Sequence, residues 1–514
     1  MKNSRTFLLQ ALMLTGVSFL LRSVGVSAQA YIARKIGAET VGISSLIGGV
    51  SGFAVTLAIS GISLGTTRLV AEGLGKNDGN YLRNVIHATL AYALVFGSFS
   101  ACLLFSSSGV IGTRWLHDQR TVAPLRLFAF SLPAIALSSC FAGYFVAVRR
   151  VFLSAPVQIA EEILRVLLTI ALLRRTVGTE QALIALALSG LIADLISATA
   201  LGALFLHDRR RLPTPSAALP LADNSLASVN HRLLSITLPV AFSAYARSGL
   251  ITLEHLLIPI GLKSYGMAHA DALASYGTLH SMAVPLLLFP SAIIASFGGL
   301  LVPELTEAMV RGETKRIRHM VGLSLSLSLI FAVGCSAVMF GFSRELGMLF
   351  YRSESAGTYI RALAPLVPVM YLDGATDAAL KGLGEQLYSM KVNILDALLS
   401  VVLVRLLLPT LGIDGYVITI YITELLNAIL SIFRLFRVTH LRLDTIRILF
   451  KPFVCAVGAA CLTRILLVAL PTLPTVHVLV AGAGCLFLLY GLLLFAVGVF
   501  NGKNVRRAWK FCTS

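Results

Sequence analysis

The sequence predicts an all-helical polytopic membrane protein with about fourteen transmembrane helices. Of its 514 residues, 57% are apolar or aromatic and 13% are charged, and the mean hydropathy is +0.85. A soluble protein usually carries about 25% charged residues. Apolar blocks of about 20 residues, each long enough to cross ~30 Å of hydrocarbon as a helix, repeat to the end of the chain. This pattern excludes a Rossmann enzyme, a nucleic-acid reader and a secreted disulfide scaffold.

The apolar blocks define the predicted spans. The first block runs well past the 7–15-residue apolar core of a signal peptide, so it is predicted to be a membrane helix. In chain order the spans are 6–33, 40–66, 84–107, 122–148, 152–173, 181–206, 233–258, 274–302, 320–342, 359–380, 388–409, 413–433, 446–470 and 475–500.

Basic residues predict the orientation. With a cytoplasmic N-terminus, the inner loops and both ends hold 26 Lys and Arg, against 11 for the outer loops. Cytoplasmic loops of membrane proteins carry this excess. Both termini are therefore expected on the cytoplasmic side of the membrane. The net charge of +18 is expected to face anionic lipid rather than nucleic acid.

One segment predicts the domain organisation. Residues 207–232 contain three prolines and a charge run, which indicates a cytoplasmic linker between two halves. A single constant offset in residue number superposes Glu72 on Glu307, Arg83 on Arg318 and Pro133 on Pro368. Because six spans separate the matched segments, the repeat is expected to be parallel, with substrate handled between the halves. The predicted parts are a six-helix lobe (1–206), the linker (207–232), a second six-helix lobe (233–435), and two extra helices with a tail (436–514).

Motifs for catalysis and for cofactors are weak. The string Gly61-Ile-Ser-Leu-Gly65 matches a nucleophile elbow, but it lies in an apolar helix, where close packing by small residues is the expected role. The chain has no GxxxxGK[ST] phosphate loop, and its seven cysteines form no CxxC pair. We therefore expect no enzyme activity, no metal site and no bound cofactor.

Arginines within spans are candidate substrate-binding residues, because an ionisable side chain at the helix centre costs about 2.5–3.5 kcal/mol or more and usually faces a cavity or a partner. The candidates are Arg22, Arg247 and Arg165. A guanidinium suits phosphate, since it binds in a bidentate manner and stays charged when dehydrated. The alternative is a structural pair with an acid. For Arg165 that acid is Glu161, four residues earlier on the same helix.

Acids within spans are candidates for ion coupling. Glu254 lies seven residues after Arg247 on one stripe, and Asp373 and Asp377 share a face. These three could bind a coupling proton or sodium ion. Asp396 and Glu424 are isolated in the sequence, Arg405 and Arg464 are expected to snorkel, and His280 is expected to be a hydrogen-bonded packing residue.

Several strings resemble a known transporter superfamily. They are Arg22-Ser-Val-Gly25 with Ala33-Arg34-Lys-Ile-Gly37, Arg68-Leu-Val-Ala-Glu72, Gly143-Tyr-Phe145, Glu161 to Arg165, and Tyr276-Gly277 running to Val302-Pro303. With the fourteen spans they resemble the multidrug/oligosaccharidyl-lipid/polysaccharide (MOP) exporter superfamily. Within it the chain is most similar to the stage V sporulation protein B group of polysaccharide-type transporters, over nearly its whole length.

The resemblance implies a function. That group is similar to the lipid II flippases, which move undecaprenyl-pyrophosphate-linked peptidoglycan precursors across the inner membrane by alternating access, using a cationic cavity. Arg22 matches an arginine of the first span in those flippases. A second cavity arginine is replaced by Ala28, and span 8 has His280 but no arginine. These departures leave room for another polyprenyl-linked glycan, and Arg247 is a candidate for the missing charge.

The sequence leaves three alternatives open: a cation-coupled multidrug antiporter of the same superfamily, a membrane-embedded transferase, and a scaffold for cell-wall synthases. The expected partners are a polyprenyl-linked saccharide, membrane lipids and the cell-wall synthesis machinery, with no nucleic acid. A monomer suffices for the architecture. Coupling to the membrane potential or to a proton or sodium gradient is the expected energy source.

Overall fold

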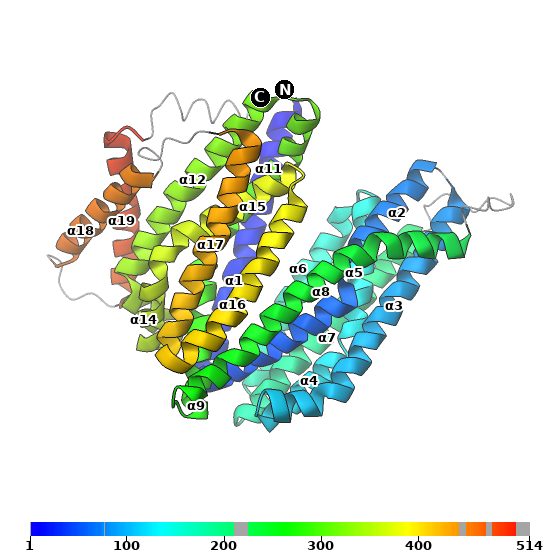
Figure 1. The fold of residues 1–514 in the computed structure, drawn as a ribbon, viewed down its shortest axis with the longest axis horizontal. Coiled ribbons are helices and arrows are strands. Elements are labelled where there is room, and N and C mark those ends of the chain that lie inside the picture. Colours follow the sequence, from blue (N-terminus) through cyan, green and yellow to red (C-terminus); the bar gives the residue numbers. More distant parts are fainter. Residues whose placement is uncertain (1, 77, 210–224, 442–448, 469–474, 500–514) are drawn as a thin grey trace. The chain divides into compact units, whose positions relative to one another are not determined.

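The computed structural model describes residues 2–76, 78–209, 225–441, 449–468 and 475–499, and these residues form helices joined by short turns (Figure 1). No β-strand occurs in these ranges. The helices of the N-terminal half are α1 (Lys2–Ile59), α2 (Ile62–Lys76), α3 (Gly79–Val110), η1 (Ile111–Trp115), η2 (Gln119–Thr121), α4 (Val122–Ala129), α5 (Leu132–Ala147), α6 (Val151–Leu173), α7 (Thr179–Asp208) and α8 (Leu226–Ser264).

The C-terminal half continues the pattern. It comprises α9 (His269–Tyr276), η5 (Gly277–Ala283), α10 (Val284–Leu288), α11 (Ser291–Val310), α12 (Thr314–Gly341), α13 (Ser343–Tyr351), α14 (Glu354–Leu363), η6 (Ala364–Leu366), α15 (Val367–Gly382), α16 (Gln386–Leu411), α17 (Ile413–Thr439), α18 (Lys451–Val468) and α19 (Thr475–Ala496).

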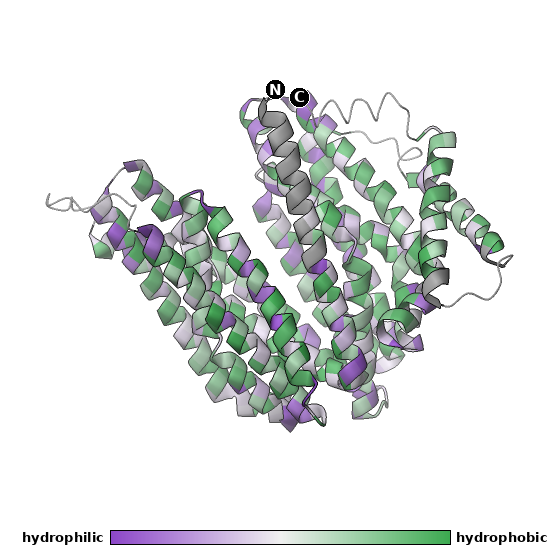
Figure 2. Cartoon of the chain, turned by 180° about the vertical axis from the view of Figure 1, so that it is seen from behind, coloured by the Kyte–Doolittle hydropathy of each residue, from purple (hydrophilic) through white to green (hydrophobic). Residues whose placement is uncertain are grey.

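The all-helical membrane class predicted from the sequence is confirmed. Within the described ranges nine helices are long and apolar enough to cross a membrane, or ten if the bent pair Gln119–Ala129 and Leu132–Ala147 forms one span. This number is compatible with fourteen predicted spans, because Arg22–Lys76, which covers two of them, counts as one candidate and several others are divided into shorter helices. Figure 2 shows hydrophobic residues along the helices and hydrophilic ones gathered toward their ends.

The chain folds into two compact units. Unit 1 contains Met1–Ala38 and Gly261–Ser514, and unit 2 contains Glu39–Ile260. The predicted lobes, 1–206 and 233–435, differ from these units in two helices. The first span packs within unit 1, where Gln29 Nε2 donates to the carbonyl oxygen of Ser281 at 3.2 Å. The seventh span, within α8, packs within unit 2.

Glycines explain why α8 belongs to unit 2. Gly61, whose φ is +79°, lies so close to α8 that a Cβ there would stand 2.7 Å from the carbonyl oxygen of Thr237. A Cβ on Gly65 would meet the Leu233 and Thr237 side chains at the same distance. The predicted packing role of the Gly61–Gly65 string therefore holds within unit 2. The predicted linker 207–232 starts on α7 and ends on α8, so both of its ends lie in unit 2.

The predicted internal repeat is visible in the helix positions. Helices α3, α5 and α6 begin at Gly79, Leu132 and Val151. The offset that carries Glu72 onto Glu307 carries these three starts onto the first residues of α12, α15 and α16. The packing repeats as well: α5 packs on α2 and α3, and α15 packs on α11 and α12. Likewise α6 packs on α7, and α16 packs on α17. Each unit is thus built on the same helical arrangement.

One repeated contact exchanges its residues between the halves. In unit 2 a Cβ on Gly143 of α5 would stand 2.7 Å from the carbonyl oxygen of Ser63 on α2. The repeat offset carries Gly143 onto Ala378 of α15 and Ser63 onto Gly298 of α11. A Cβ on Gly298 would stand 3.0 Å from Cβ of Ala378. The close helix approach is kept, but the glycine is on the opposite helix.

One repeat position near the helix ends carries opposite charges in the two units and forms an ion pair in each. Arg150, just before α6, pairs with the buried carboxylate of Asp208 at the end of α7, and Tyr144 donates to the same carboxylate at 3.0 Å. In unit 1 the repeat equivalent of Arg150 is Glu385, which pairs with Arg434 of α17 at 2.8 Å. Each pair links the turn before one helix to the C-terminal part of the next helix. The two units therefore use this position for the same structural link, with opposite charges.

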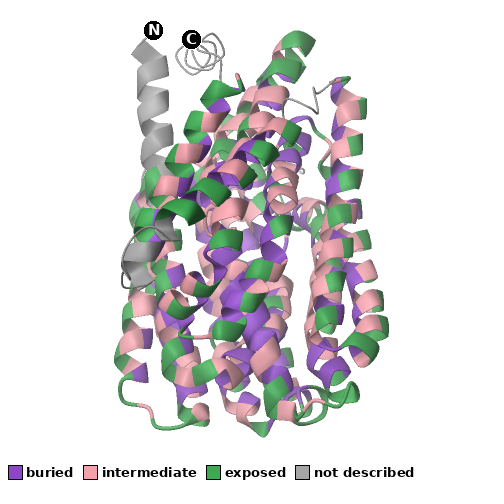
Figure 3. Ribbon diagram, turned by 90° about the vertical axis from the view of Figure 1, so that its left-hand side faces the viewer, coloured by how far each residue is buried: buried purple, intermediate pink, exposed green. Residues whose placement is uncertain are grey.

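The two additional C-terminal helices pack within unit 1. Helices α18 and α19 contact each other and α12. Tyr490 of α19 donates to the carbonyl oxygen of Ile330 at 2.9 Å, and Gly334 of α12 accommodates the rings of Tyr490 and Phe487. Figure 3 shows buried and exposed residues alternating along the helices. The six cysteines in the described ranges are free.

Candidate functional site

Arg22 is an exposed cation on α1 in unit 1. Its side chain forms no ion pair with the residues that the structure describes. One turn earlier, Phe19 packs on Phe289 with ring centroids 5.0 Å apart, which fixes this part of α1 on the residue that follows α10. Arg22 also interacts electrostatically with Tyr371 of α15, whose hydroxyl donates to the carbonyl oxygen of Leu287 at 2.6 Å. The guanidinium is therefore held beside a polar group while remaining open to a ligand.

Arg247 is an exposed arginine within a predicted span of unit 2. It lies on α8 and forms no ion pair within the described residues. The residue after it, Ser248, accepts a hydrogen bond from Thr56 at 3.1 Å, which ties this turn of α8 to the second part of α1. Further along the helix, His255 packs on Gly49, where a Cβ would meet its ring at 3.3 Å. Glu254, predicted for ion coupling, is half-buried on the same helix.

Arg165 has a different environment, because three carboxylates surround its guanidinium. Its Nη2 atom is 2.7 Å from Glu161 Oε1 and 2.9 Å from Asp194 Oδ1, and its Nε atom is 3.6 Å from Glu162 Oε2. Asp194 comes from α7 and is 3% exposed. We call these four residues the Arg165 cluster. The pair with Glu161, which the sequence leaves open as the alternative to phosphate binding, is present, and two further acids join it. An approaching phosphate would therefore meet net negative charge.

A second group of acids lies in unit 1. Asp373 of α15 interacts electrostatically with Asp377 and with Asp396 of α16, and Glu424 of α17 interacts with Asp373 and Asp396. Asp377 accepts from Ser389 and pairs with Lys381 at 2.6 Å. The Oδ1 atom of Asp373 is buried and has no hydrogen-bond partner in the described ranges. We call Asp373, Asp377, Asp396 and Glu424 the unit 1 acids.

The unit 1 acids include two residues that the sequence left isolated. Asp396 is the repeat equivalent of Glu161, so the offset was the signal that could have linked it to a charged position of the first half. Glu424 had no comparable signal, because its electrostatic interaction with Asp373 depends on how α17 and α15 are rotated. The structure places Glu254 in unit 2 and Asp373 in unit 1, so the three predicted coupling acids do not belong to one group.

His280 lies in a stretch of π-helix, η5, a form that often marks functional positions. Its ring stacks on Tyr276 with centroids 5.3 Å apart and planes 10° apart. The neighbouring carbonyl of Ser281 accepts the hydrogen bond from Gln29 of α1. His280 therefore packs on an aromatic ring, and α1 is hydrogen-bonded to the same distorted turn.

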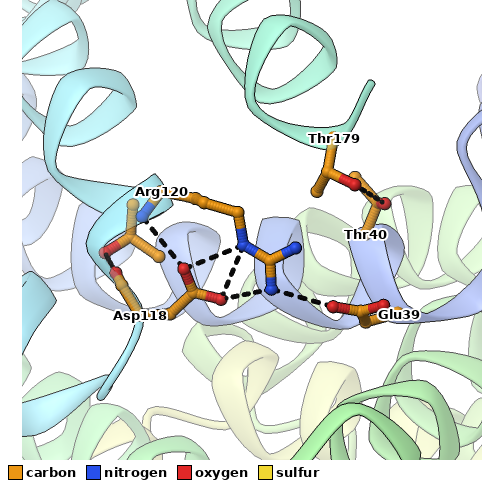
Figure 4. A network of polar contacts seen from close by, with 6 residues as sticks. Glu39, Thr40, Asp118, Arg120 and Thr179 are labelled. Atoms are coloured by element: carbon orange, nitrogen blue, oxygen red, sulfur yellow. Dashed lines mark hydrogen bonds and ion pairs between the residues drawn. The ribbon is translucent and has the colours of Figure 1, made fainter.

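An ion-pair network lies where the chain enters unit 2. Figure 4 shows Arg120 between Asp118 and Glu39: its guanidinium is 2.7 Å from Asp118 Oδ2 and 2.8 Å from Glu39 Oε1. Asp118 also accepts from the backbone N–H of Arg120, which caps η2. Beside it, Thr40 contacts Thr179 at the start of α7. The network fixes the first residues of unit 2, directly after the break in α1 at Gly37.

Comparison with known families identifies the chain. The model of the family described as "Polysaccharide biosynthesis protein" matches residues 10–309, more than half of the sequence. The chain belongs to this family. A second model, MatE, matches residues 264–406.

Curated relatives and solved structures agree with this assignment. The chain is 26% identical to the stage V sporulation protein B of Bacillus subtilis (strain 168) over 380 residues, covering 71% of each chain. It is 21% identical to the lipid II flippase MurJ of the same organism over 407 residues, 74% of each chain. Its fold matches a lipid II flippase MurJ in an inward closed conformation with a TM-score of 0.70 at 12% identity, over 94% of this chain and 98% of the other. It also matches an inward-facing multidrug resistance MATE family transporter with a TM-score of 0.64 at 16% identity, over 83% and 99% of the two chains.

The resemblance noted in the sequence is therefore confirmed. The protein is a multi-pass membrane transporter of the MOP exporter superfamily, on the polysaccharide-transporter branch.

Proposed function

We propose that this protein is an alternating-access flippase, which moves a polyprenyl-pyrophosphate-linked cell-envelope glycan precursor outward across the bacterial inner membrane. The observation that carries the proposal is the exposed guanidinium of Arg22, which has no ion-pair partner in the described chain and lies on a helix of a flippase-like fold. A pyrophosphate headgroup cannot cross ~30 Å of hydrocarbon unaided. A guanidinium in the path replaces part of its hydration with bidentate, charge-assisted hydrogen bonds.

Arg247 is proposed as the second phosphate-binding residue, because it is an exposed arginine within a predicted span of unit 2 and forms no ion pair in the described chain. Arg165 contributes less to phosphate binding in this proposal, since three carboxylates already surround it. The polyprenyl tail stays in lipid while the headgroup moves. On this proposal the protein is a transporter rather than an enzyme and works as a monomer with both termini in the cytoplasm. It receives its substrate from the cell-wall synthesis machinery.

The experiment measures outward flipping of a fluorescent lipid II analogue in proteoliposomes. Arg22→Ala is expected to lower the flipping rate at least about tenfold, which corresponds to the loss of about 1.4 kcal/mol of differential binding. Arg22→Lys should retain part of the rate, because the charge remains but the planar fork is lost. Arg405→Ala is the matched control, since it removes an exposed arginine of α16 in the same unit. Full flipping by folded Arg22→Ala would contradict the assignment of Arg22.

Coupling to a cation gradient is proposed at the unit 1 acids. Asp373 and Glu424 interact with each other, and neither forms an ion pair within the described residues. Carboxylates in an apolar bundle require a counter-charge, and a sodium ion or a proton supplies it. The same observation favours the second candidate function, a cation-coupled multidrug antiporter. Efflux of a cationic dye by protein that does not flip the lipid II analogue would support the antiporter instead.

A further inference from the structure

One corner of the fold is built alike in the two units. In unit 2 it follows α3 and comprises η1, η2 and α4, and in unit 1 it follows α12 and comprises α13 and α14. The repeat offset carries Gly112 onto Gly347, and a Cβ added to either glycine would stand 2.5 Å from the helix that ends the corner, α4 or α14. It also carries His117 onto Arg352, and both residues have a φ of 53°. Equivalent residues therefore occupy equivalent places at this end of each unit.

Each corner carries an arginine that lies over an aromatic ring. The guanidinium carbon of Arg126 on α4 is 5.6 Å from the centroid of the Phe105 ring. The guanidinium carbon of Arg361 on α14 is 5.1 Å from the centroid of the Phe340 ring. The offset carries Arg126 onto Arg361 and carries the first ring onto the second. The same cation–π pair is therefore formed once in each unit.

The described chain does not neutralise either guanidinium. Among the described residues neither Arg126 nor Arg361 has an ion-pair partner, and the one hydrogen bond of the two side chains runs from Arg126 Nε to Ser108 Oγ at 3.1 Å. Both arginines are exposed, and so are the rings of Phe105 (45%) and Phe340 (46%). A guanidinium has five N–H donors, and stacking on a ring leaves the donors at its edge free. These edges can bind an acceptor from outside the protein.

The surroundings of the two pairs are those of a membrane–water boundary. Phe105 and Phe340 lie in the last turns of the predicted spans 84–107 and 320–342. Near the first pair, Phe130 is 59% exposed and packs on Phe105 with ring centroids 5.7 Å apart. Trp115 of the same corner is 53% exposed, as is typical of the aromatic belt at the headgroup level. A favourable helix end explains a cation in the last turn of α4 and of α14. It does not explain an exposed ring beneath that cation in both units.

We infer that Arg126 and Arg361 form two equivalent phospholipid sites, one in each unit. The guanidinium edge binds the phosphate of a headgroup through bidentate, charge-assisted hydrogen bonds, and the phenylalanine ring lies against the start of the acyl chains. The exposed rings favour a glycerophospholipid over free phosphate, because only the lipid covers apolar surface together with the charge. With both termini in the cytoplasm, as proposed above, the sites face the outer leaflet. The inference does not depend on which substrate is transported.

Native mass spectrometry of the purified full-length protein tests the sites by counting bound lipids. The probes are phosphatidylglycerol, diacylglycerol with the same chains, and inorganic phosphate. Arg126→Ala and Arg361→Ala are each expected to weaken the binding of one phosphatidylglycerol at least about tenfold, and the double variant that of two. Arg344→Ala is the matched control, because it removes a 77% exposed arginine of the same corner that is already paired with Glu354. It should bind phosphatidylglycerol as wild type does.

Four results would overturn the inference. The first is wild-type phosphatidylglycerol binding by the folded double variant, and the second is equal binding of diacylglycerol by the wild-type protein. The third is displacement of the lipid by equimolar inorganic phosphate, which would make phosphate alone the ligand. The fourth is loss of binding for a lipid II analogue but not for phosphatidylglycerol, which would assign the arginines to the substrate. A lower apparent Tm in lipid-free detergent with unchanged lipid binding would show a helix-end role only. If the alanine variants do not fold, Arg126→Gln and Arg361→Gln are judged by the same criteria.

Discussion

The Nε atom of Arg34 donates a hydrogen bond to the carbonyl oxygen of Phe350 at 2.6 Å, which ties the end of the first transmembrane helix to α13 within unit 1. Three residues later, Gly37 interrupts α1 with φ 79° and ψ 166°. Two residues after that, Glu39 pairs with Arg120 within unit 2. The chain is therefore fixed to one unit just before the break and to the other just after it. The Arg34-to-Gly37 string therefore lies where the chain passes from unit 1 to unit 2.

The Gly37→Ala variant is expected to be destabilised. The φ/ψ pair of Gly37 lies in a region that is essentially restricted to glycine, so a side chain there costs about 1–3 kcal/mol even though no atom lies within 4 Å of the added Cβ. The apparent Tm in detergent and the flipping rate should both fall. Gly48→Ala is the control, because Gly48 is helical and also has open space around it. A Tm for Gly37→Ala equal to that of Gly48→Ala would show that the break does not require glycine.

Loss of Arg120 should destabilise unit 2 more than loss of Glu39. Asp118 has a 7% exposed side chain, so removal of the guanidinium leaves a buried carboxylate whose remaining donor among the described residues is the backbone N–H of residue 120. Arg120→Ala is expected to cost about 1–3 kcal/mol. Glu39→Gln should cost about 1 kcal/mol or less, since that carboxylate is 38% exposed and water screens it.

Thermal unfolding of the Arg120 and Glu39 single variants and of the double variant measures the coupling between the two residues. Equal losses for Arg120→Ala and Glu39→Gln would contradict the central role of Asp118.

The exchanged glycines predict a rescue by a double substitution. Gly298→Ser alone should lower the apparent Tm, because its Cβ would be 3.0 Å from that of Ala378. Adding Ala378→Gly recreates in unit 1 the Ser63–Gly143 arrangement of unit 2 and is expected to recover most of the loss. Ala378→Gly alone serves as the reference for the cost of a helical glycine, about 0.5–1 kcal/mol. Additive losses in the double variant would argue against equivalence of the two contacts.

Neutralising the unit 1 acids should remove the proposed dependence on a cation gradient. Asp373→Asn and Glu424→Gln keep the side-chain shapes but remove the charges that attract a cation. Flipping by proteoliposomes with an imposed sodium or proton gradient is expected to become insensitive to that gradient. Glu354→Gln is the control, because this acid is 69% exposed and pairs with Arg344 near the start of α14. A gradient response unchanged in both Asp373→Asn and Glu424→Gln would place the coupling elsewhere.

The order of the helices could be predicted from the sequence because membrane spanning depends on composition along the chain. Helices form over the predicted spans in the described ranges, and the repeat offset reappears in the starts of α5 and α15. Contacts within one helix could also be anticipated: a pair with Glu161, four residues earlier, is the alternative role that the sequence offers for Arg165, and that pair is present.

Contacts between helices could not be predicted from the sequence in the same way. Asp194 reaches Arg165 from α7, and Glu424 meets Asp373 from α17, because of how those helices are rotated about their axes. Rotation depends on packing against several neighbours, which a single sequence does not state. Nor could the sequence show to which unit the first and seventh spans belong. Close contacts between helices, such as that of Gly61 with Thr237, determine this assignment, and they cannot be read from one sequence.

The path of the chain has a practical consequence. Residues 209–225 connect α7 to α8, two helices of the same unit, while the only passages between the units in the sequence follow Ala38 and Ile260. A protein cut between α7 and α8 would therefore divide unit 2 into two peptides and leave both passages intact. Co-expressed fragments ending and starting within this connection should reassemble, so it offers a place to insert a reporter or a protease site without altering the joints between the units.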